Sequence, residues 1–199
     1  MQPFEVRAVV NLGGPLRHQE LEPLLKAGLG SVWLRAHESD DDAMLEAERW
    51  SELLRERGTP CIRSLALWSR DCGDGLHLRG RDVAPVGAQV CSVSVHSMAE
   101  LVRAEAYPGA VALVSPVFAP TSKLSALPPM GLEGLQLLTL RSRVPCLALG
   151  GIEAHRLDGC EAAGAAGAAI LGALLTETGR EALVTWLQQR RGSVRLPSS

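Results

Sequence analysis

Short hydrophobic runs alternate with longer amphipathic stretches almost to the end of the chain. A hydrophobic run of a few residues predicts a buried strand, and hydrophobic residues three and four positions apart predict a helix. The strands are expected at 6–11, 31–35, 61–65, 75–78, 90–94, 110–115, 145–150 and 168–171. The helices are expected at 20–27, 40–57, 98–106, 132–142, 154–163 and 177–191, with a short one near 65–71. The interval between Leu78 and Val90 is too short for a full helix, so we expect an abbreviated connection there.

The clearest helical pattern covers residues 40–57. Ser39 or Asp40 can accept a hydrogen bond from the first turn, and acidic residues follow directly. Gly58 and then Pro60 end the pattern, as expected just beyond a helix.

Strands that are hydrophobic on both faces and separated by helices indicate a parallel sheet covered on its outside. Eight such units in 199 residues predict a compact α/β fold, the (β/α)₈ TIM barrel. We expect one domain over residues 1–192 and a flexible tail over 193–199. An open doubly wound sheet is the alternative, but Gly13 and Gly14 do not complete the GxGxxG pattern typical of one.

The composition narrows the function. With 46% hydrophobic residues, 21% charged residues and a net charge of −2, the chain is neither disordered nor suited to binding nucleic acid or an anionic membrane. No hydrophobic run reaches the roughly 20 residues of a membrane span, and the first residues resemble no signal peptide. The 5 cysteines form no CxxC pair, which argues against a disulfide framework or a zinc site. We expect a cytoplasmic protein, and a homo-oligomer is compatible with the sequence.

Glycines follow the last two predicted strands. Gly150-Gly151 comes directly after strand seven, and Gly172-Ala173 comes after strand eight. TIM barrels often bind phosphate at these two strand ends, where glycines let backbone amides approach an anion. The alternative is that these glycines only allow tight turns.

Polar residues at the other strand ends predict an anionic ligand. They are Arg35 and His37 after strand two, Arg63 and Ser64 after three, His77, Arg79, Arg81 and Asp82 around four, Ser94 and His96 after five, and Ser122 and Lys123 after six. Arginine and lysine together at the mouth of the barrel, the end at which its strands finish, suit a phosphorylated compound. Two alternatives remain: some arginines point to solvent, and His77 is a hydrogen-bonded core residue.

At these residues the chain resembles the superfamily of thiamin-phosphate synthases and TenI-like thiazole tautomerases. The resemblance covers about residues 5–190 and is most specific in DGLHL at 74–78, SVHSMAELVRAE at 94–105, SPVFAPTSK at 115–123, GLEGL at 131–135 and LALGGI through AAGAAGAAILGAL at 147–174. It implies a TIM barrel that acts on a phosphorylated thiazole or thiamin phosphate. Synthases of the family join a pyrimidine diphosphate to thiazole phosphate and release pyrophosphate with magnesium. Tautomerases of the family move a proton on thiazole carboxylate phosphate and so form its aromatic isomer.

The resemblance also implies site residues. It assigns phosphate binding to Gly150, Gly151, Gly172 and Ala173, ligand contacts to Arg35, Ser94, Ser122 and Lys123, and a place in the pocket to His77. We add Arg63 as a substrate-binding residue from its strand end. His37, His77 and Lys123 are the candidate catalytic residues, since a histidine can titrate near neutrality.

Several positions depart from the synthase pattern. Trp33 replaces glutamine, His37 replaces lysine and Gly172 replaces serine, while Arg63-Ser64 replaces Asn-Asp. Asp82 is then the single candidate magnesium ligand, so we expect a magnesium cofactor only if the protein is a synthase. Loss of the other carboxylate is similar to the tautomerase branch, but the acid/base histidine of that branch falls on Pro116.

Three functions stay open. The first is a TenI-like protein that binds thiazole phosphate and isomerises it or a relative. The second is a thiamin-phosphate synthase in which arginines replace part of the metal's charge. The third is a binding or regulatory protein without activity on the same scaffold.

Overall fold

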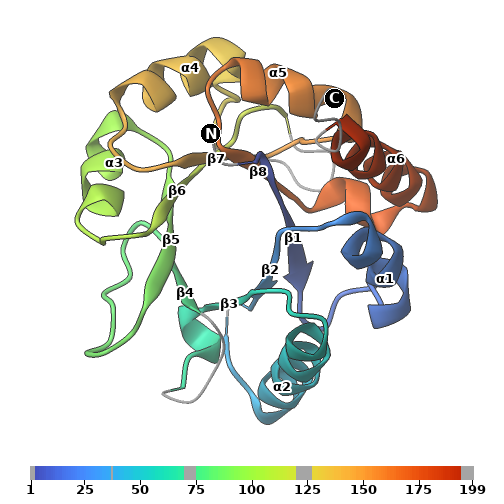
Figure 1. Ribbon diagram of the computed structural model, residues 1–199. Coiled ribbons are helices and arrows are strands. Elements are labelled where there is room, and N and C mark those ends of the chain that lie inside the picture. Colours follow the sequence, from blue (N-terminus) through green and yellow to red (C-terminus); the bar gives the residue numbers. More distant parts are fainter. Residues whose placement is uncertain (1–2, 37, 70–74, 120–126, 194–199) are drawn as a thin grey trace, which may run out of the picture.

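Eight parallel strands form a closed barrel, in which β8 pairs with β1 (Figure 1). The structure is a computed structural model that describes residues 3–36, 38–69, 75–119 and 127–193. The strands are β1 (Glu5–Asn11), β2 (Ser31–Arg35), β3 (Cys61–Ser64), β4 (Gly75–Leu78), β5 (Val90–Val95), β6 (Val111–Val114), β7 (Cys146–Leu149) and β8 (Gly167–Ile170). All eight predicted strands and the TIM barrel are confirmed.

Helices cover the outside of the barrel (Figure 1). They are α1 (His18–Ala27), α2 (Asp41–Glu56), α3 (Met98–Glu105), α4 (Gly131–Arg141), α5 (Leu157–Ala162) and α6 (Glu177–Ser193), with the 3₁₀ turns η1 (Leu65–Leu67), η2 (Ala154–Arg156) and η3 (Gly172–Leu175). The segment expected as one helix at 154–163 is η2 followed by α5. No helix lies between β4 and β5, so the abbreviated connection is confirmed.

The α2 helix begins and ends where its sequence predicts. The Asp40 carboxylate accepts a hydrogen bond from the Ala43 amide at 2.7 Å. Gly58 adopts a φ of +63° just after the helix, a conformation that favours glycine. Trp50 and Leu54 lie on the buried face and attach the helix to the barrel.

Alternating residues of each strand face opposite sides of the barrel wall. The outward residues join the helices in the larger hydrophobic core, and the inward ones form a second, smaller cluster. The inner cluster consists of Val9, Trp33, Ile62, Leu113, Leu147 and Ala169. The barrel is therefore packed at its centre, and a ligand must bind at an end.

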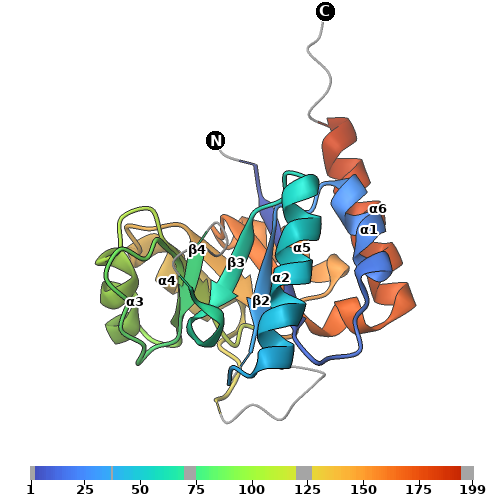
Figure 2. The same ribbon diagram turned by 90° about the horizontal axis from the view of Figure 1, so that it is seen from below.

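A partly buried ion pair lies at the end of the barrel at which the strands begin. The Arg7 guanidinium contacts the Glu5 carboxylate at 2.9 Å and donates to the Ser31 hydroxyl at 2.8 Å. Arg7 is only 4% exposed. The start of β1 and the end of α6 lie at this same end (Figure 2). These packed and charged side chains fill this end of the barrel. A ligand is therefore expected at the opposite end, the mouth, where the strands finish.

Closure of the barrel requires glycine at position 167. A Cβ there would lie 2.4 Å from the Glu5 carbonyl oxygen of the neighbouring strand. We expect Gly167→Ala to lower the free energy of unfolding by about 1–3 kcal/mol, the usual cost of overpacking. Chemical denaturation measures this change. Gly192→Ala is the matched control because a Cβ there meets no atom within 4 Å; equal stability of the two variants would contradict the account.

Candidate functional site

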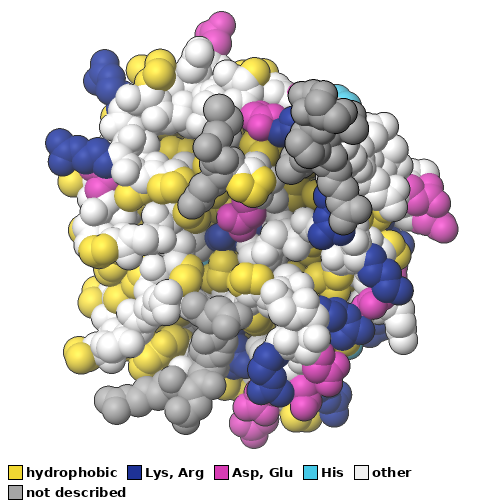
Figure 3. Space-filling model, viewed as in Figure 1, with side chains coloured by type: hydrophobic (Ala, Val, Ile, Leu, Met, Phe, Trp, Pro, Cys, Tyr) yellow, Lys and Arg dark blue, Asp and Glu magenta, His cyan; other side chains and the backbone are white. Residues whose placement is uncertain are grey.

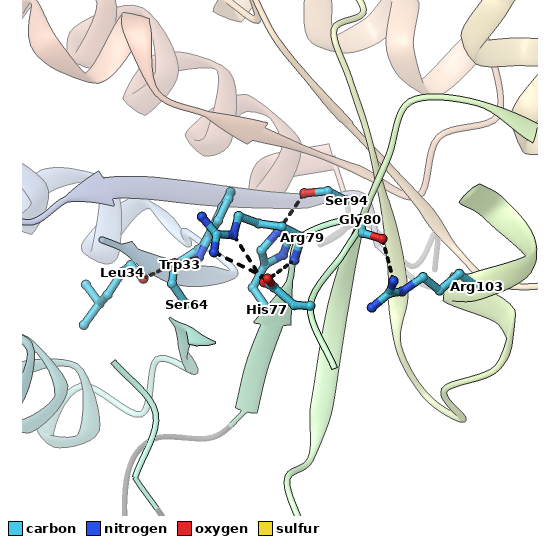
Figure 4. A network of polar contacts seen from close by, with 9 residues as sticks. Trp33, Leu34, Ser64, His77, Arg79, Gly80, Ser94 and Arg103 are labelled. Carbon is cyan, nitrogen blue, oxygen red and sulfur yellow. Dashed lines mark hydrogen bonds and ion pairs between the residues drawn. The ribbon is translucent and has the colours of Figure 1, made fainter. Parts of the chain in front are cut away.

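The carboxyl ends of the strands hold a network of buried polar side chains. The Trp33 indole N–H donates to the Ser64 hydroxyl at 3.1 Å, and this hydroxyl donates to the Leu34 carbonyl oxygen at 3.3 Å (Figure 4). The Trp33 ring packs on the His77 ring with centroids 3.9 Å apart. These contacts join β2, β3 and β4 into one rigid floor beneath the mouth of the barrel.

His77 is held in this floor as a neutral residue. Its Nδ1 lies 2.8 Å from the Ser92 hydroxyl, and its Nε2 lies 2.9 Å from the Ser94 hydroxyl. Burial lowers the pKa of His77 to about 3, and the positive charge of Arg7 acts in the same direction. A ring with this pKa does not accept a proton near neutrality. The two hydrogen bonds and the burial favour the alternative that His77 is a hydrogen-bonded core residue, and its catalytic role stays a prediction.

Arg35 lies beside a cavity at the ends of β1 and β2. Its Nε donates to the Asn11 side-chain oxygen at 2.6 Å, and burial lowers its pKa. The cavity has a volume of about 380 Å³ and is lined by both residues and by four carboxylate side chains, Glu38, Asp40, Asp42 and Glu46. Two of these carboxylates are engaged, since Asp40 caps α2 and Glu46 accepts from the Gly13 amide at 2.8 Å. An anion is favoured here only next to Arg35.

Asp82 does not fit the role of a magnesium ligand. Its carboxylate accepts from the Arg79 backbone amide at 2.8 Å and from the Arg79 guanidinium at 3.3 Å. The positive charge of Arg79 compensates the charge of this carboxylate, and the carboxylate points toward its own loop. The described residues contain no group of three histidine, cysteine or acidic side chains that could hold a metal. Within the described part of the chain, the donor set therefore lacks the carboxylate cluster that magnesium prefers.

Gly150 and Gly151 form a tight turn after β7. Both have positive φ values, +97° and +61°. A Cβ on Gly150 would lie 2.9 Å from the Cα of Pro116, and one on Gly151 would lie 2.5 Å from the Ala119 carbonyl oxygen. The turn is thus packed tightly against the segment that follows β6, and this packing alone requires glycine. Phosphate binding by the turn remains a prediction.

The second glycine segment lies next to the first. β7 pairs with β8, so Gly172 and Ala173 at the start of η3 follow a strand adjacent to the Gly150-Gly151 turn. Ala173 is 8% exposed. The structure thus brings together the two predicted phosphate-binding segments.

Arg63 does not face the mouth. Its neighbours Ile62 and Ser64 point into the barrel, so Arg63 points outward, where its guanidinium donates to the Ser51 hydroxyl of α2 at 2.9 Å. It is 3% exposed. The prediction that Arg63 contacts substrate is not supported by this placement, because one position along a strand reverses the side.

The other predicted residues fall into two groups. Ser94 lies in the floor through its bond to His77, whereas Arg79 and Arg81 are exposed near the mouth. His37, Ser122 and Lys123 lie outside the described residues, as does most of the predicted tail. Their roles stay predictions from the resemblance.

His96 is a residue that we did not select as catalytic, although it directly follows β5. Its Nδ1 lies 2.6 Å from the Ser115 carbonyl oxygen, which joins the ends of β5 and β6. The available signal was its place in the Ser-Val-His-Ser stretch at a strand end. The contact with Ser115 needs the three-dimensional pairing of β5 and β6.

Comparison with known proteins identifies the family of the chain. The family model described as thiamine monophosphate synthase, TMP-TENI, matches residues 14–174. The chain belongs to this family. A thiamine-phosphate synthase of Syntrophomonas wolfei is 31% identical over 168 residues, which cover 79% of this chain and 80% of the relative. One of Chloroflexus aurantiacus is 32% identical over 149 residues, 70% of this chain and 68% of the relative.

Solved structures share the barrel. A thiamine phosphate pyrophosphorylase from Pyrococcus furiosus has a TM-score of 0.75 at 20% identity, with 97% of this chain and 98% of that chain covered. The (S)-3-O-geranylgeranylglyceryl phosphate synthase from Thermoplasma acidophilum has a TM-score of 0.66 at 11% identity, with 94% and 93% covered. At these identities the likeness shows the fold of this TMP-TENI family member and nothing finer.

The surface carries mixed charge at the end opposite the mouth. Figure 3 shows basic and acidic side chains interspersed on this face, without one continuous patch of a single sign. In the described part of the chain, no helix is both long enough and apolar enough to cross a membrane.

Neutral burial of His77 predicts a pH-dependent stability. The unfolded state binds a proton at His77 below about pH 6.5 whereas the folded state does not until about pH 3, so stability falls as the pH drops through this window. We expect the free energy of unfolding to fall by about 2 kcal/mol more in the wild type than in His77→Gln between pH 7 and pH 5. Denaturant titrations at the two pH values measure the difference. His155→Gln, an exposed histidine beside Glu153, is the control; an unchanged slope in His77→Gln would refute the assignment.

Proposed function

We propose that this protein acts in thiamin biosynthesis by binding thiazole phosphate, or a closely related phosphorylated heterocycle, at the carboxyl end of the barrel. The observation that carries the proposal is the pair of adjacent segments after β7 and β8, Gly150-Gly151 and Gly172-Ala173. Backbone amides at such turns can surround a phosphate without a side chain in the way. The floor formed by β2, β3 and β4 lies at the same end of the barrel, and Arg35 adds a positive charge there.

The first candidate activity is the joining of pyrimidine diphosphate to thiazole phosphate. It is supported by the relatives, which are named thiamine-phosphate synthases. In this reaction Arg35, Arg81 and Lys123 would stabilise the departing pyrophosphate, and Arg79 would have to leave its ion pair with Asp82 to take part. Arg63 has no part in it because its guanidinium is bonded to Ser51.

The second candidate activity is proton transfer on a thiazole carboxylate phosphate. It is favoured by the donor set of the mouth, because Asp82 is bonded to Arg79 and does not offer a free carboxylate to magnesium. Isomerisation needs a bound phosphate and one group that moves a proton, and it releases no pyrophosphate. The mouth of the barrel can bind a phosphate and hold one proton-transferring group without a carboxylate cluster.

Lys123 provides a test of ligand binding. The resemblance places its ammonium group on the phosphorylated ligand, so Lys123→Ala removes a charge-assisted contact. We expect thiazole phosphate to bind about 10- to 100-fold more weakly to this variant, measured by calorimetry. Lys26→Ala is the matched control, since Lys26 is exposed at the end of α1 with one weak ion pair at 3.8 Å. Failure of the wild type to bind thiazole phosphate or thiamin phosphate would refute the proposed function.

The two activities are separated by one pair of assays. The wild type is incubated with pyrimidine diphosphate and thiazole phosphate, with and without magnesium, and the formation of thiamin phosphate is followed. Product supports the synthase. Absence of product under both conditions, together with conversion of thiazole carboxylate phosphate to its aromatic isomer, supports the isomerase. Tight binding without either reaction would contradict both and indicate a binding protein.

A further inference from the structure

A histidine at the mouth is placed to move protons. His96 directly follows β5, and its side chain is exposed. Its Nδ1 lies 2.6 Å from the Ser115 carbonyl oxygen. A carbonyl oxygen only accepts, so Nδ1 carries the proton in the neutral ring and Nε2 holds the free electron pair. Among the described residues, no group is bonded to Nε2.

The backbone of His96 is fixed on the rim. The His96 amide donates to the Glu100 carboxylate at 2.6 Å, and the Glu100 amide donates to the Ser97 hydroxyl at 3.3 Å. These two bonds form the start of α3. The start of α3 therefore fixes the backbone of His96, and the end of β6 holds its ring through Nδ1.

His96 is linked to the predicted phosphate turn through direct contacts. Ser115, which accepts its Nδ1–H, precedes Pro116, and Pro116 lies against the Gly150 turn. The Phe118 amide continues this contact by donating to the Gly150 carbonyl oxygen at 3.0 Å. A phosphate bound at the turn would therefore bring the rest of a small ligand close to His96.

The other described histidines lack this combination. His77 is buried with both ring nitrogens bonded, and its pKa is about 3. The His18 ring packs edge-on against Trp50 with centroids 3.9 Å apart. His155 lies 3.5 Å from the Glu153 carboxylate and belongs to η2. Among the described histidines, only His96 combines exposure, a fixed tautomer and contact with the segment that packs on the Gly150-Gly151 turn.

We propose that His96 is the proton-transferring catalytic residue of this site and acts on a phosphorylated thiazole that carries a carboxylate. This inference rests on the proposed binding of thiazole phosphate. The C–H bond at the ring carbon that bears the carboxylate breaks, its electron pair enters the ring, and the proton forms an N–H bond at Nε2. That N–H bond then breaks as a proton returns to a second carbon of the ligand. The composition of the ligand is unchanged, so no oxidant or reductant is needed.

The test compares three variants with thiazole carboxylate phosphate as substrate. Formation of the aromatic isomer is followed by nuclear magnetic resonance in D₂O, and thiazole phosphate affinity is measured by calorimetry. We expect His96→Gln and His96→Ala to turn over at least about 100-fold more slowly than the wild type. Their affinities should stay within about threefold. Added imidazole should restore part of the rate of His96→Ala, while His155→Gln should keep the wild-type rate.

The outcomes separate this inference from the proposed function. A wild type that binds no thiazole phosphate refutes the proposed function, and the inference falls with it. A wild type that binds thiazole phosphate but forms no isomer overturns the inference alone. A His96→Gln variant that keeps its rate within about threefold also overturns the inference alone. Retained affinity in the variants shows that they are folded.

Discussion

Parallel pairing around a closed ring places all eight strand ends of the barrel on one rim, and every feature of the candidate site follows from this constraint. Because β8 pairs with β1, the wall has no free edge, and inward and outward side chains alternate along the strands, with one register shift between β4 and β5 at Leu76/His77. The inner hydrophobic cluster fills the middle, and the Arg7–Glu5 ion pair lies at the end where the strands begin. Polar groups at the opposite end are left as the place for chemistry.

The electrostatics of that rim differ from those of a carboxylate site for metals. His77 stays neutral because it is buried and bonded to two serines. The Asp82 carboxylate is hydrogen-bonded to Arg79, and the Asp40 carboxylate caps α2. Both carboxylates therefore have partners within the protein. Among the described residues, the rim offers a ligand the two glycine segments, the guanidinium of Arg35 and the imidazole of His96, with Arg79 and Arg81 exposed nearby. This combination suits a small phosphorylated molecule and the movement of a proton.

Much of the fold could be predicted from the sequence because each strand is a short hydrophobic run between clear helical patterns. The capping of α2 by Asp40 and the end of this helix at Gly58 were equally local signals. The side to which Arg63 points was not local, since it depends on the register in which β3 joins β2 and β4. The neutrality of His77 depends on Ser92 and Ser94, which the neighbouring strand brings to its ring. The link from His96 to the glycine turn needs β5, β6 and β7 side by side.

The proposed function places the phosphate of the ligand at the turns after β7 and β8. A crystal structure of the protein with thiazole phosphate would locate this group. We expect phosphate oxygens at about 3 Å from backbone amides of Gly151 and of Gly172 or Ala173. Phosphate bound instead in the cavity beside Asn11 and Arg35, with both glycine segments empty, would contradict it.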